Sequence, residues 1–168
     1  MARFEAHFPI GTRPRLAMAL LLYAACRRED VVRLGPQHAQ NGRLRFTQAK
    51  NESRSPVEID IPMHSDLARV IDATRSGHLT FLVTAYGRPF STAGFGLRFR
   101  EWCDEVGLHH CSSHGLRKAA AARLAESGAT PHEIMAITGH RTLSEVERYT
   151  RAANKPGLAD SAMAKLEG

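Results

Sequence analysis

Residues 112–149 hold most of the side chains in this chain that could act on a phosphodiester, in the run SSHGLRKAAAARLAESGATPHEIMAITGHRTLSEVERY. His114 and Arg117 lie near its start, His140 follows a glycine, and Tyr149 stands at its end. Arginine and histidine side chains bind phosphate oxygens, and a tyrosine hydroxyl can attack a phosphorus that is already polarised. The run therefore predicts a phosphodiester-handling site with a tyrosine nucleophile.

His114 and Arg117 are three residues apart, which places both on one face of a helix. Ser112 or Ser113 is the expected start of that helix, so both side chains lie in its first turn. The free N–H groups and the dipole of a helix favour an anion there. Either residue alone is more often an ordinary polar side chain, and their combination with the later histidine and tyrosine is what favours a phosphate site.

Helices must position these groups, and the sequence predicts where they begin and end. Thr12 is a candidate N-cap for an apolar helix that runs through Ala24, and a shorter helix ends at Gly35. Arg27 lies at the junction of these two helices. The further predicted helices span residues 65–75, from Ser91 or Thr92 to about Val106, 112–128, 130–139, 142–149 and 158–166, and capping boxes are expected at Thr130 with Glu133 and at Thr142 with Glu145.

A different pattern runs from Gly35 to Pro62, where apolar and polar residues alternate. Asn41-Gly42 is a strong signal for a tight turn. The alternation on either side predicts a small antiparallel sheet of three strands with one buried face. Lys50 falls at the tip between two of these strands, where a lysine is most often simply solvated.

The composition fits one domain with a hydrophobic core, since 43% of the 168 residues are hydrophobic. The expected fold class is α+β, mainly α-helical, with the small antiparallel sheet on one edge. The net charge of +6 favours a polyanionic partner. No apolar run is long enough to span a membrane and no signal peptide is recognisable, so we expect no membrane partner.

Cysteine is sparse and odd in number, with Cys26, Cys103 and Cys111. This favours a reducing compartment and core thiols over a disulfide scaffold. A zinc site built from His109, His110 and their neighbours is disfavoured, because the spacing matches neither a zinc finger nor a Cys-x-x-Cys knuckle.

Taken in order, these residues resemble the catalytic half of the tyrosine recombinases, the phage-integrase family. The family pattern is an arginine after a helix, a lysine on a β-hairpin, a His-x-x-Arg pair, a histidine or tryptophan in a Gly-His corner, and the tyrosine. The matching residues, in the same order, are Arg27, Lys50, His114, Arg117, His140 and Tyr149. The match extends over residues 12–166, and six positions in order are far more specific than any single motif.

The resemblance implies that Arg27 and Arg117 bind the non-bridging oxygens of a scissile phosphate in double-stranded DNA. There they would offset the negative charge that grows in the five-coordinate transition state. His140 would donate a further hydrogen bond. With two arginines neutralising the phosphate, no metal or other cofactor is expected.

The resemblance also assigns the proton transfers and the covalent step. Tyr149 would attack and become joined to the 3′-phosphate, and His114 would help to accept its proton or hold the phosphate. Lys50 would protonate the leaving 5′-oxygen as general acid. The ester keeps the bond energy, so no ATP is needed, and attack by the 5′-hydroxyl of another strand completes recombination.

The sequence departs from the family pattern at two places, and we also expect it to lack a domain that relatives usually carry. Ala24, Ala25 and Cys26 replace the usual threonine-glycine pair and its neighbour before the first arginine, and Lys118 stands where many relatives have histidine. Relatives usually carry a separate amino-terminal helical domain that clamps the DNA. We expect residues 1–168 to be the catalytic domain without that domain, and to bind DNA weakly as a monomer when free.

The partners implied are double-stranded DNA and further copies of the chain, as a homotetramer on synapsed DNA in which the last helix docks on a neighbour. For the free protein, the sequence leaves equally open that the apolar face of this helix folds back onto its own core. An accessory DNA-bending protein is a further candidate, and the expected location is the bacterial cytoplasm, at the nucleoid. Candidate DNA contacts, each of which could equally be a solvated charge, are Arg43, Arg45, Arg54, Arg98, Arg100 and Lys118.

Other functions stay open on the sequence alone. A type IB topoisomerase uses the same chemistry and rejoins the strand to its own 5′-hydroxyl. A DNA-binding module that has lost catalysis would keep the fold without positioning the side chains. A helix-turn-helix regulator would need neither Tyr149 nor Lys50.

Overall fold

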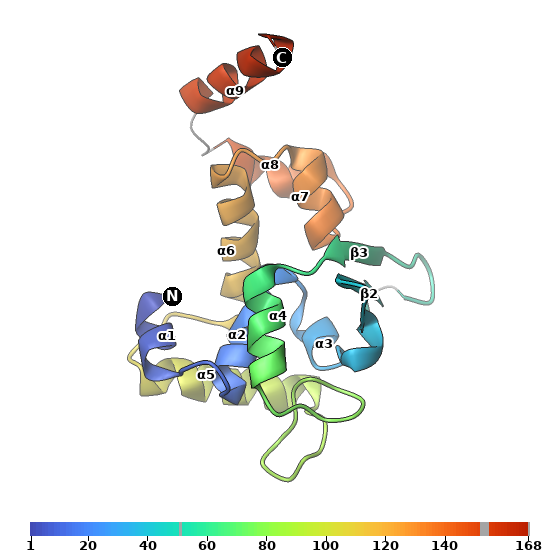
Figure 1. The fold of residues 1–168 in the computed structure, drawn as a ribbon, viewed down its shortest axis with the longest axis vertical. Coiled ribbons are helices and arrows are strands. Elements are labelled where there is room, and N and C mark those ends of the chain that lie inside the picture. Colours follow the sequence, from blue (N-terminus) through green and yellow to red (C-terminus); the bar gives the residue numbers. More distant parts are fainter. Residues whose placement is uncertain (51, 152–154, 168) are drawn as a thin grey trace.

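A computed structural model describes residues 1–50, 52–151 and 155–167 of the chain (Figure 1). The fold is α+β and mainly helical with a three-stranded antiparallel sheet, as predicted. The helices are α1 (Ala2–His7), α2 (Arg13–Tyr23), α3 (Arg28–Val31), α4 (Ser65–Ala73), α5 (Thr92–Glu105), α6 (Ser113–Glu126), α7 (Pro131–Thr138), α8 (Leu143–Thr150) and α9 (Lys155–Glu167), and the strands are β1 (Ala39–Gln40), β2 (Arg43–Thr47) and β3 (Glu58–Pro62). Within the described residues, none of the helices combines the length and the apolar character needed to cross a membrane.

Helix α2 forms the centre of the core. Thr12 precedes it in extended backbone, and Pro14 lies in its first turn, where the missing N–H leaves no hydrogen bond unmade. Leu16, Leu20 and Leu21 are fully buried. Helices α4, α5 and α6 all pack against α2, so its segment 16–22 is surrounded by protein and is apolar on every side.

Helix α1 was not predicted, because six residues give little periodic signal. Its position depends on aromatic packing instead. The Phe4 ring lies 4.7 Å from that of Phe8 and 6.0 Å from that of Phe99 in α5, centroid to centroid. Burying these rings fixes the first helix against the core.

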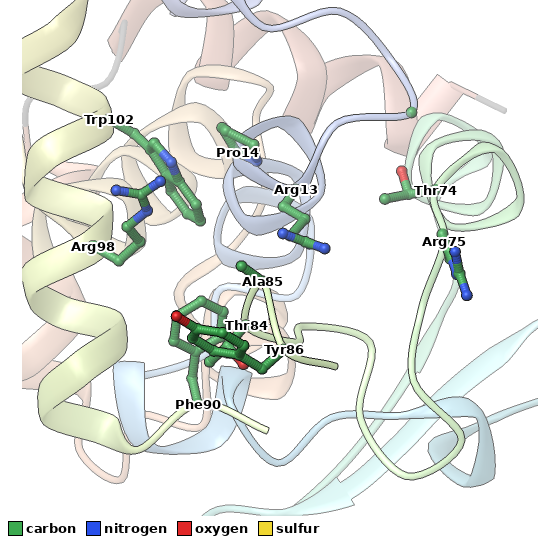
Figure 2. Close-up of a pocket in the computed structure, with 11 residues that line it drawn as sticks. Arg13, Pro14, Thr74, Arg75, Thr84, Ala85, Tyr86, Phe90, Arg98 and Trp102 are labelled. Atoms are coloured by element: carbon green, nitrogen blue, oxygen red, sulfur yellow. The ribbon is translucent and has the colours of Figure 1, made fainter. Parts of the chain in front are cut away.

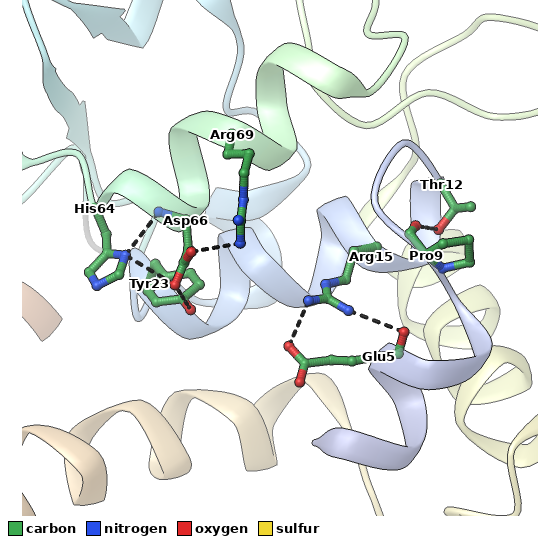
Figure 3. A network of polar contacts seen from close by, with 8 residues as sticks. All are labelled: Glu5, Pro9, Thr12, Arg15, Tyr23, His64, Asp66 and Arg69. Carbon is green, nitrogen blue, oxygen red and sulfur yellow. Dashed lines mark hydrogen bonds and ion pairs between the residues drawn. The ribbon is translucent and has the colours of Figure 1, made fainter.

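Polar contacts tie α2 to the helices on either side of it (Figure 3). Arg15 forms an ion pair of 2.9 Å with Glu5 of α1. At the other end of α2, the Tyr23 hydroxyl donates to Asp66 of α4 at 3.1 Å, and Arg69 pairs with the same carboxylate at 2.8 Å. Partly exposed pairs of this kind contribute little stability each, so we assign them mainly to orienting the helices.

The sheet has the buried face that the alternation predicted. Leu44 pairs with Ile61 and Phe46 with Ile59 across β2 and β3, and all four side chains are buried. Successive residues of a strand point to opposite faces, so one face of this sheet covers the core.

The Asn41-Gly42 turn between β1 and β2 is formed as predicted. Both residues have positive φ, 51° and 70°, as a two-residue hairpin turn of type I′ requires. Asparagine and glycine are the residues that adopt this conformation most readily.

Two helix ends differ from the prediction. Helix α4 stops at Ala73, before the predicted end, because Thr74 adopts an extended conformation. Helix α9 begins at Lys155 rather than after Gly157, since a proline in the first turn is compatible with a helix. The sequence NKPG also predicts a break in the chain from Asn154 to Gly157, and Asn154 lies outside the described residues.

Capping interactions shape the turns between α6, α7 and α8. The Thr130 hydroxyl accepts a hydrogen bond from Glu133 N at 3.2 Å, and the Glu133 carboxylate accepts one from Thr130 N at 2.6 Å. The Glu145 carboxylate accepts from the N–H groups of Arg141 and Thr142, at 2.9 and 3.1 Å. Both predicted capping boxes are therefore present, and they define the corner that follows α7.

Helix α9 stands away from the rest of the fold in Figure 1. Its Met163 and Leu166 side chains are 57% and 80% exposed. These apolar groups are not folded back onto the core of the same chain, which was one of the two arrangements left open by the sequence.

We predict that Leu20→Ala destabilises the protein by about 2 to 5 kcal/mol, because it removes fully buried methyl groups from the central helix and leaves a cavity. Urea unfolding followed by circular dichroism measures the loss. Leu97→Ala is the matched control, since Leu97 on α5 is 65% exposed, and it should change the free energy of unfolding by less than about 0.5 kcal/mol. Equal losses in the two variants would contradict this account of the core.

Candidate active site

Arg117 is the most deeply buried of the six predicted catalytic side chains, at 5% exposed. It lies near the start of α6, and its Nη1 donates to the backbone carbonyl of Ala25 at 2.6 Å. Ala25 lies between α2 and Arg27. This hydrogen bond therefore joins α6 to the corner between α2 and α3.

Ala25 adopts a left-handed backbone conformation, with φ of 47°. That conformation costs a residue with a Cβ about 1 to 2 kcal/mol relative to the right-handed one. In the family that the sequence resembles, a glycine usually stands at the position of Ala25. The backbone here has the left-handed conformation that glycine favours, although the residue is alanine. With the backbone in this conformation, the Ala25 carbonyl accepts the hydrogen bond from Arg117.

Burial, and after it the nearby positive charge of Arg27, lowers the pKa of Arg117 to about 10. The guanidinium is still charged at neutral pH. Its Nη2 has no hydrogen-bond acceptor among the described residues. A buried donor without an acceptor is unfavourable, so an incoming anionic oxygen would be stabilised at this group.

Arg27 precedes α3, and its side chain is held from the end of β2. Its Nη1 donates to Oε1 of Gln48 at 2.5 Å. The Asp30 carboxylate accepts from Arg27 N at 3.1 Å and from Ala49 N at 2.7 Å. Burial raises the pKa of Asp30, and these two N–H donors oppose the rise. The start of α3 and the end of β2 are thus fixed to one another.

Gln48 also reaches the corner between α7 and α8. It is 1% exposed, and its Nε2 donates to the Thr138 carbonyl at 2.9 Å. Thr138 is the last residue of α7, and Gly139 follows in a left-handed conformation with φ of 68°. One side chain from the sheet therefore contacts both Arg27 and the residue that leads into the Gly-His corner.

His140 is oriented by Thr138. The Thr138 Oγ1 lies 2.7 Å from the carbonyl of Ile134 and 2.6 Å from His140 Nδ1. A carbonyl can only accept, so the hydroxyl proton points to Ile134 and His140 Nδ1 is the donor to Thr138. Nδ1 therefore carries the proton when the ring is neutral, and Nε2 is then an acceptor.

The charge state of His140 follows from its surroundings. Burial, and then the positive charge of Arg117, lower its pKa to about 4. The ring is accordingly neutral near pH 7. Donation from Nε2 to a phosphate oxygen therefore requires the ring to take up a proton, which a bound phosphate would favour.

Tyr149 lies in the last turn of α8 and packs against the small buried cluster around Val146. Its ring centroid is 6.4 Å from that of His140. Arg148 donates from Nη2 to the Tyr149 hydroxyl at 2.7 Å, and its guanidinium carbon lies 4.8 Å from the tyrosine ring centroid. This places a positive charge beside the predicted nucleophile.

His114 and Lys50 are exposed, and within the described residues no hydrogen bond, ion pair or ring contact joins them to the other four. His114 lies in the first turn of α6, where burial and the charges of Lys118 and Arg117 lower its pKa. Lys50 lies in the connection between β2 and β3, shortly after Gln48. The structure thus connects Arg27, Arg117, His140 and Tyr149 closely and leaves the other two at the rim.

Of the predicted DNA contacts on the sheet side and on α6, Arg43 is half-buried and the other three are exposed. Arg43 and Arg45 share the carboxylate of Asp60, at 2.5 and 3.0 Å. Arg54, in the connection between β2 and β3, and Lys118, on α6, have no hydrogen-bond or ion-pair partner in the part of the chain that is described. The side-chain charges of Arg54 and Lys118 are therefore unpaired within the described residues.

The predicted contacts on α5 lie elsewhere. Arg98 pairs with Glu101 at 2.7 Å, and its guanidinium carbon is 5.6 Å from the Trp102 ring centroid. It lines a hollow of about 600 Å³ that none of the six predicted catalytic residues lines (Figure 2). Arg100 donates to the backbone carbonyl of His109.

No group of three or more His, Cys, Asp or Glu side chains in the described ranges is placed to hold a metal ion. Within the histidine-rich stretch, His109 Nδ1 lies 3.0 Å from Asp104 Oδ1.

Three side chains of the site were missed by sequence reasoning: Gln48, Thr138 and Arg148. Gln48 had a signal, because the alternation through Leu44 and Phe46 places it on the buried face of the sheet. A polar residue at a buried position needs hydrogen-bond partners. The other two had no comparable signal, since their contacts depend on how α7 and α8 pack.

Solved structures with the same fold are tyrosine recombinases. The Tn1549 transposon integrase in complex with transposon right end DNA matches with a TM-score of 0.69 at 16% identity, over 91% of this chain and 58% of that one. A lambda integrase dimer bound to a COC′ core site matches with a TM-score of 0.69 at 22% identity, over 88% of this chain and 55% of that one. The fold is therefore that of a tyrosine recombinase catalytic domain.

Sequence comparison gives the family. The profile described as the phage integrase family matches residues 1–155, and the chain belongs to that family. Tyrosine recombinase XerC of Herpetosiphon aurantiacus is 22% identical over 87% of this chain and 50% of its own length. Tyrosine recombinase XerD of Xanthomonas campestris pv. campestris is 27% identical over 92% of this chain and 53% of its own length. The chain thus spans about half the length of the curated relatives it matches.

The lowered pKa of His140 predicts a pH dependence of stability. Its folded value of about 4 lies below the usual 6.5, so the unfolded chain binds more protons between these values. The free energy of unfolding should therefore fall as the pH drops from about 6.5 toward 4. We expect His140→Asn, which can still donate to Thr138, to show a smaller fall in Tm between pH 7 and pH 5 than the wild type.

The matched control is His132→Asn, because His132 is exposed in the first turn of α7. It should keep the wild-type dependence of Tm on pH. An identical dependence in the wild type and in His140→Asn would contradict the environment described for this histidine.

Proposed function

We propose that the chain is the catalytic part of a site-specific DNA recombinase, in which Tyr149 attacks a scissile phosphodiester. The observation that carries the proposal is the connected set of contacts that brings Arg27, Arg117, His140 and Tyr149 into one site. Membership of the phage integrase family supports it. The same relationship favours recombination over the type IB topoisomerase alternative.

Arg27 and Arg117 bind the non-bridging oxygens of the phosphate in this proposal. In the described residues neither guanidinium forms an ion pair with a carboxylate, and the contacts recorded for their nitrogens are to a neutral amide and a backbone carbonyl. Their charges therefore remain available to an anion. Guanidinium groups held before the substrate arrives stabilise the transition state without reorganising.

The covalent step forms a bond between the Tyr149 oxygen and phosphorus and breaks the bond between phosphorus and the 5′-oxygen. The phenolic proton passes to His114 or to a base that His114 helps to place, and Lys50 protonates the leaving 5′-oxygen. Lys50 is exposed on the connection after β2, so closing it onto the DNA is part of this proposal. His140 donates to the phosphate once the ring is protonated.

Double-stranded DNA is the proposed substrate, and copies of the chain are the proposed partners. A lambda integrase tetramer bound to a Holliday junction has the same fold, with a TM-score of 0.66 at 22% identity over 84% of this chain and 44% of that one. The exposed apolar side chains of α9, Met163 and Leu166, are suited to docking on a neighbouring copy. We propose a tetramer on synapsed DNA, a monomer when free, an optional DNA-bending helper protein, and action in the bacterial cytoplasm.

We predict that the wild-type chain forms a covalent adduct with a nicked duplex from which cleavage releases a short 5′-hydroxyl strand. Because the target sequence is unknown, the probe is a library of such duplexes with a randomised sequence at the nick. Tyr149→Phe removes the attacking oxygen, so it should give no adduct on a denaturing gel. EDTA in every reaction tests the expectation that no metal ion is required.

Tyr86→Phe is the control, because Tyr86 is 90% exposed in the loop after α4 and lies outside the proposed site. It should form the adduct at the wild-type rate. An adduct that survives in Tyr149→Phe, or a wild-type chain that binds the library without forming any adduct, would contradict the proposed function.

A further inference from the structure

Gln48 is the one side chain in the described residues that contacts both Arg27 and the end of α7. Its Oε1 accepts from Arg27 Nη1 at 2.5 Å, and its Nε2 donates to the Thr138 carbonyl at 2.9 Å. The side chain is 1% exposed, and the N–H of the same residue donates to the Val57 carbonyl at 2.9 Å. Backbone and side chain are therefore both fixed.

The amide of Gln48 matches the hydrogen-bonding needs of both partners. A guanidinium can only donate and a backbone carbonyl can only accept, so the bridging side chain must accept on one side and donate on the other. This also settles which end of the Gln48 amide is oxygen. A carboxylate would repel the Thr138 carbonyl, and an apolar side chain would leave both partners unpaired in a buried place.

We infer that Gln48 is a positioning residue for catalysis, which sets the place of the Arg27 guanidinium relative to the corner that carries His140. The inference rests on the proposed function. Thr138 holds His140 through its hydroxyl and Gln48 through its carbonyl, so a shift of Gln48 reaches both groups. Misplacing a reacting or charge-stabilising group by about 1 Å can slow a reaction by about 100-fold.

The backbone of the α7–α8 corner is shaped around this side chain. A Cβ on Gly139 would lie 2.4 Å from Gln48 Nε2, which is closer than real Cβ contacts allow. Gly139 therefore permits both the left-handed turn and the approach of the amide. Its neighbour in sequence is His140, so the close approach occurs directly beside a predicted catalytic residue.

The test measures single-turnover cleavage of a nicked duplex that the wild-type chain cleaves, with enzyme in excess. Gln48→Met keeps the size of the side chain and removes both hydrogen bonds, and Gln48→Glu keeps the acceptor and removes the donor. We expect both to lower the cleavage rate constant by about 10- to 100-fold, with the dissociation constant for the duplex changed by less than about 3-fold. Gln40→Met, in the exposed strand β1, should keep the wild-type rate constant.

A merely structural role gives a different result. A destabilised variant loses folded enzyme, so the amplitude of adduct formation falls while the rate constant of the folded fraction is unchanged. Unchanged rate constants in Gln48→Met, or a wild-type rate constant in Gln48→Glu, would overturn the inference.

Gly139→Ala decides the matter if Gln48→Met fails to fold. It pushes the Gln48 amide from its place, so the rate constant should fall at least 10-fold. Gly128→Ala is the matched control, because Gly128 also has a positive φ, 85°, but an added Cβ there meets nothing within 4 Å. Equal rate constants in these two glycine variants would overturn the inference.

The two proposals fail in distinguishable ways. A wild-type chain that forms no adduct counts against the proposed function and therefore against the role of Gln48 as well. A wild-type chain that forms the adduct while the Gln48 and Gly139 variants cleave at its rate counts against the role of Gln48 alone.

Discussion

The guanidinium of Arg117 and the carbonyl of Ala25 meet 2.6 Å apart in the interior, and the site depends on that contact. Burying an arginine is costly, and no carboxylate among the described residues pairs with it. The backbone at Ala25 is also held in a conformation that disfavours a Cβ. A buried unpaired charge or a strained backbone conformation is typically retained at a functional site, where it serves to bind or position a ligand.

Further hydrogen bonds between separate elements connect the Arg117–Ala25 contact to the rest of the site. The corner after α2 holds Arg117 and leads into Arg27, Gln48 joins Arg27 to the end of α7, and Thr138 orients the following histidine. Each link is short and buried or half-buried, so the positions of the two guanidiniums and the histidine are not independent. Lys50 is exposed and lies outside this chain of contacts, so the proposed reaction requires its side chain to approach the substrate.

Local signals in the sequence were sufficient to predict most of the helices, strands and turns. The capping boxes at Thr130 and Thr142, the Asn41-Gly42 turn and the alternation along β2 each depend on neighbouring residues, and each is present. Helix α1 and the Gln48–Thr138 hydrogen bond depend on residues far apart in sequence, 90 positions in the second case, and no local pattern encodes them. The candidate catalytic residues came from an ordered resemblance rather than from any single spacing, and their roles remain proposals.

The most direct test of the central claim is whether the buried guanidinium of Arg117 binds an anion. Inorganic phosphate should raise the Tm of the wild type above its value in chloride of equal ionic strength, because a ligand that binds only the folded state stabilises it. Arg117→Met should lose that increment, while Arg123→Met, which removes an exposed guanidinium from the same helix, should keep it. An increment that persists in Arg117→Met, or the absence of any increment in the wild type, would contradict the account.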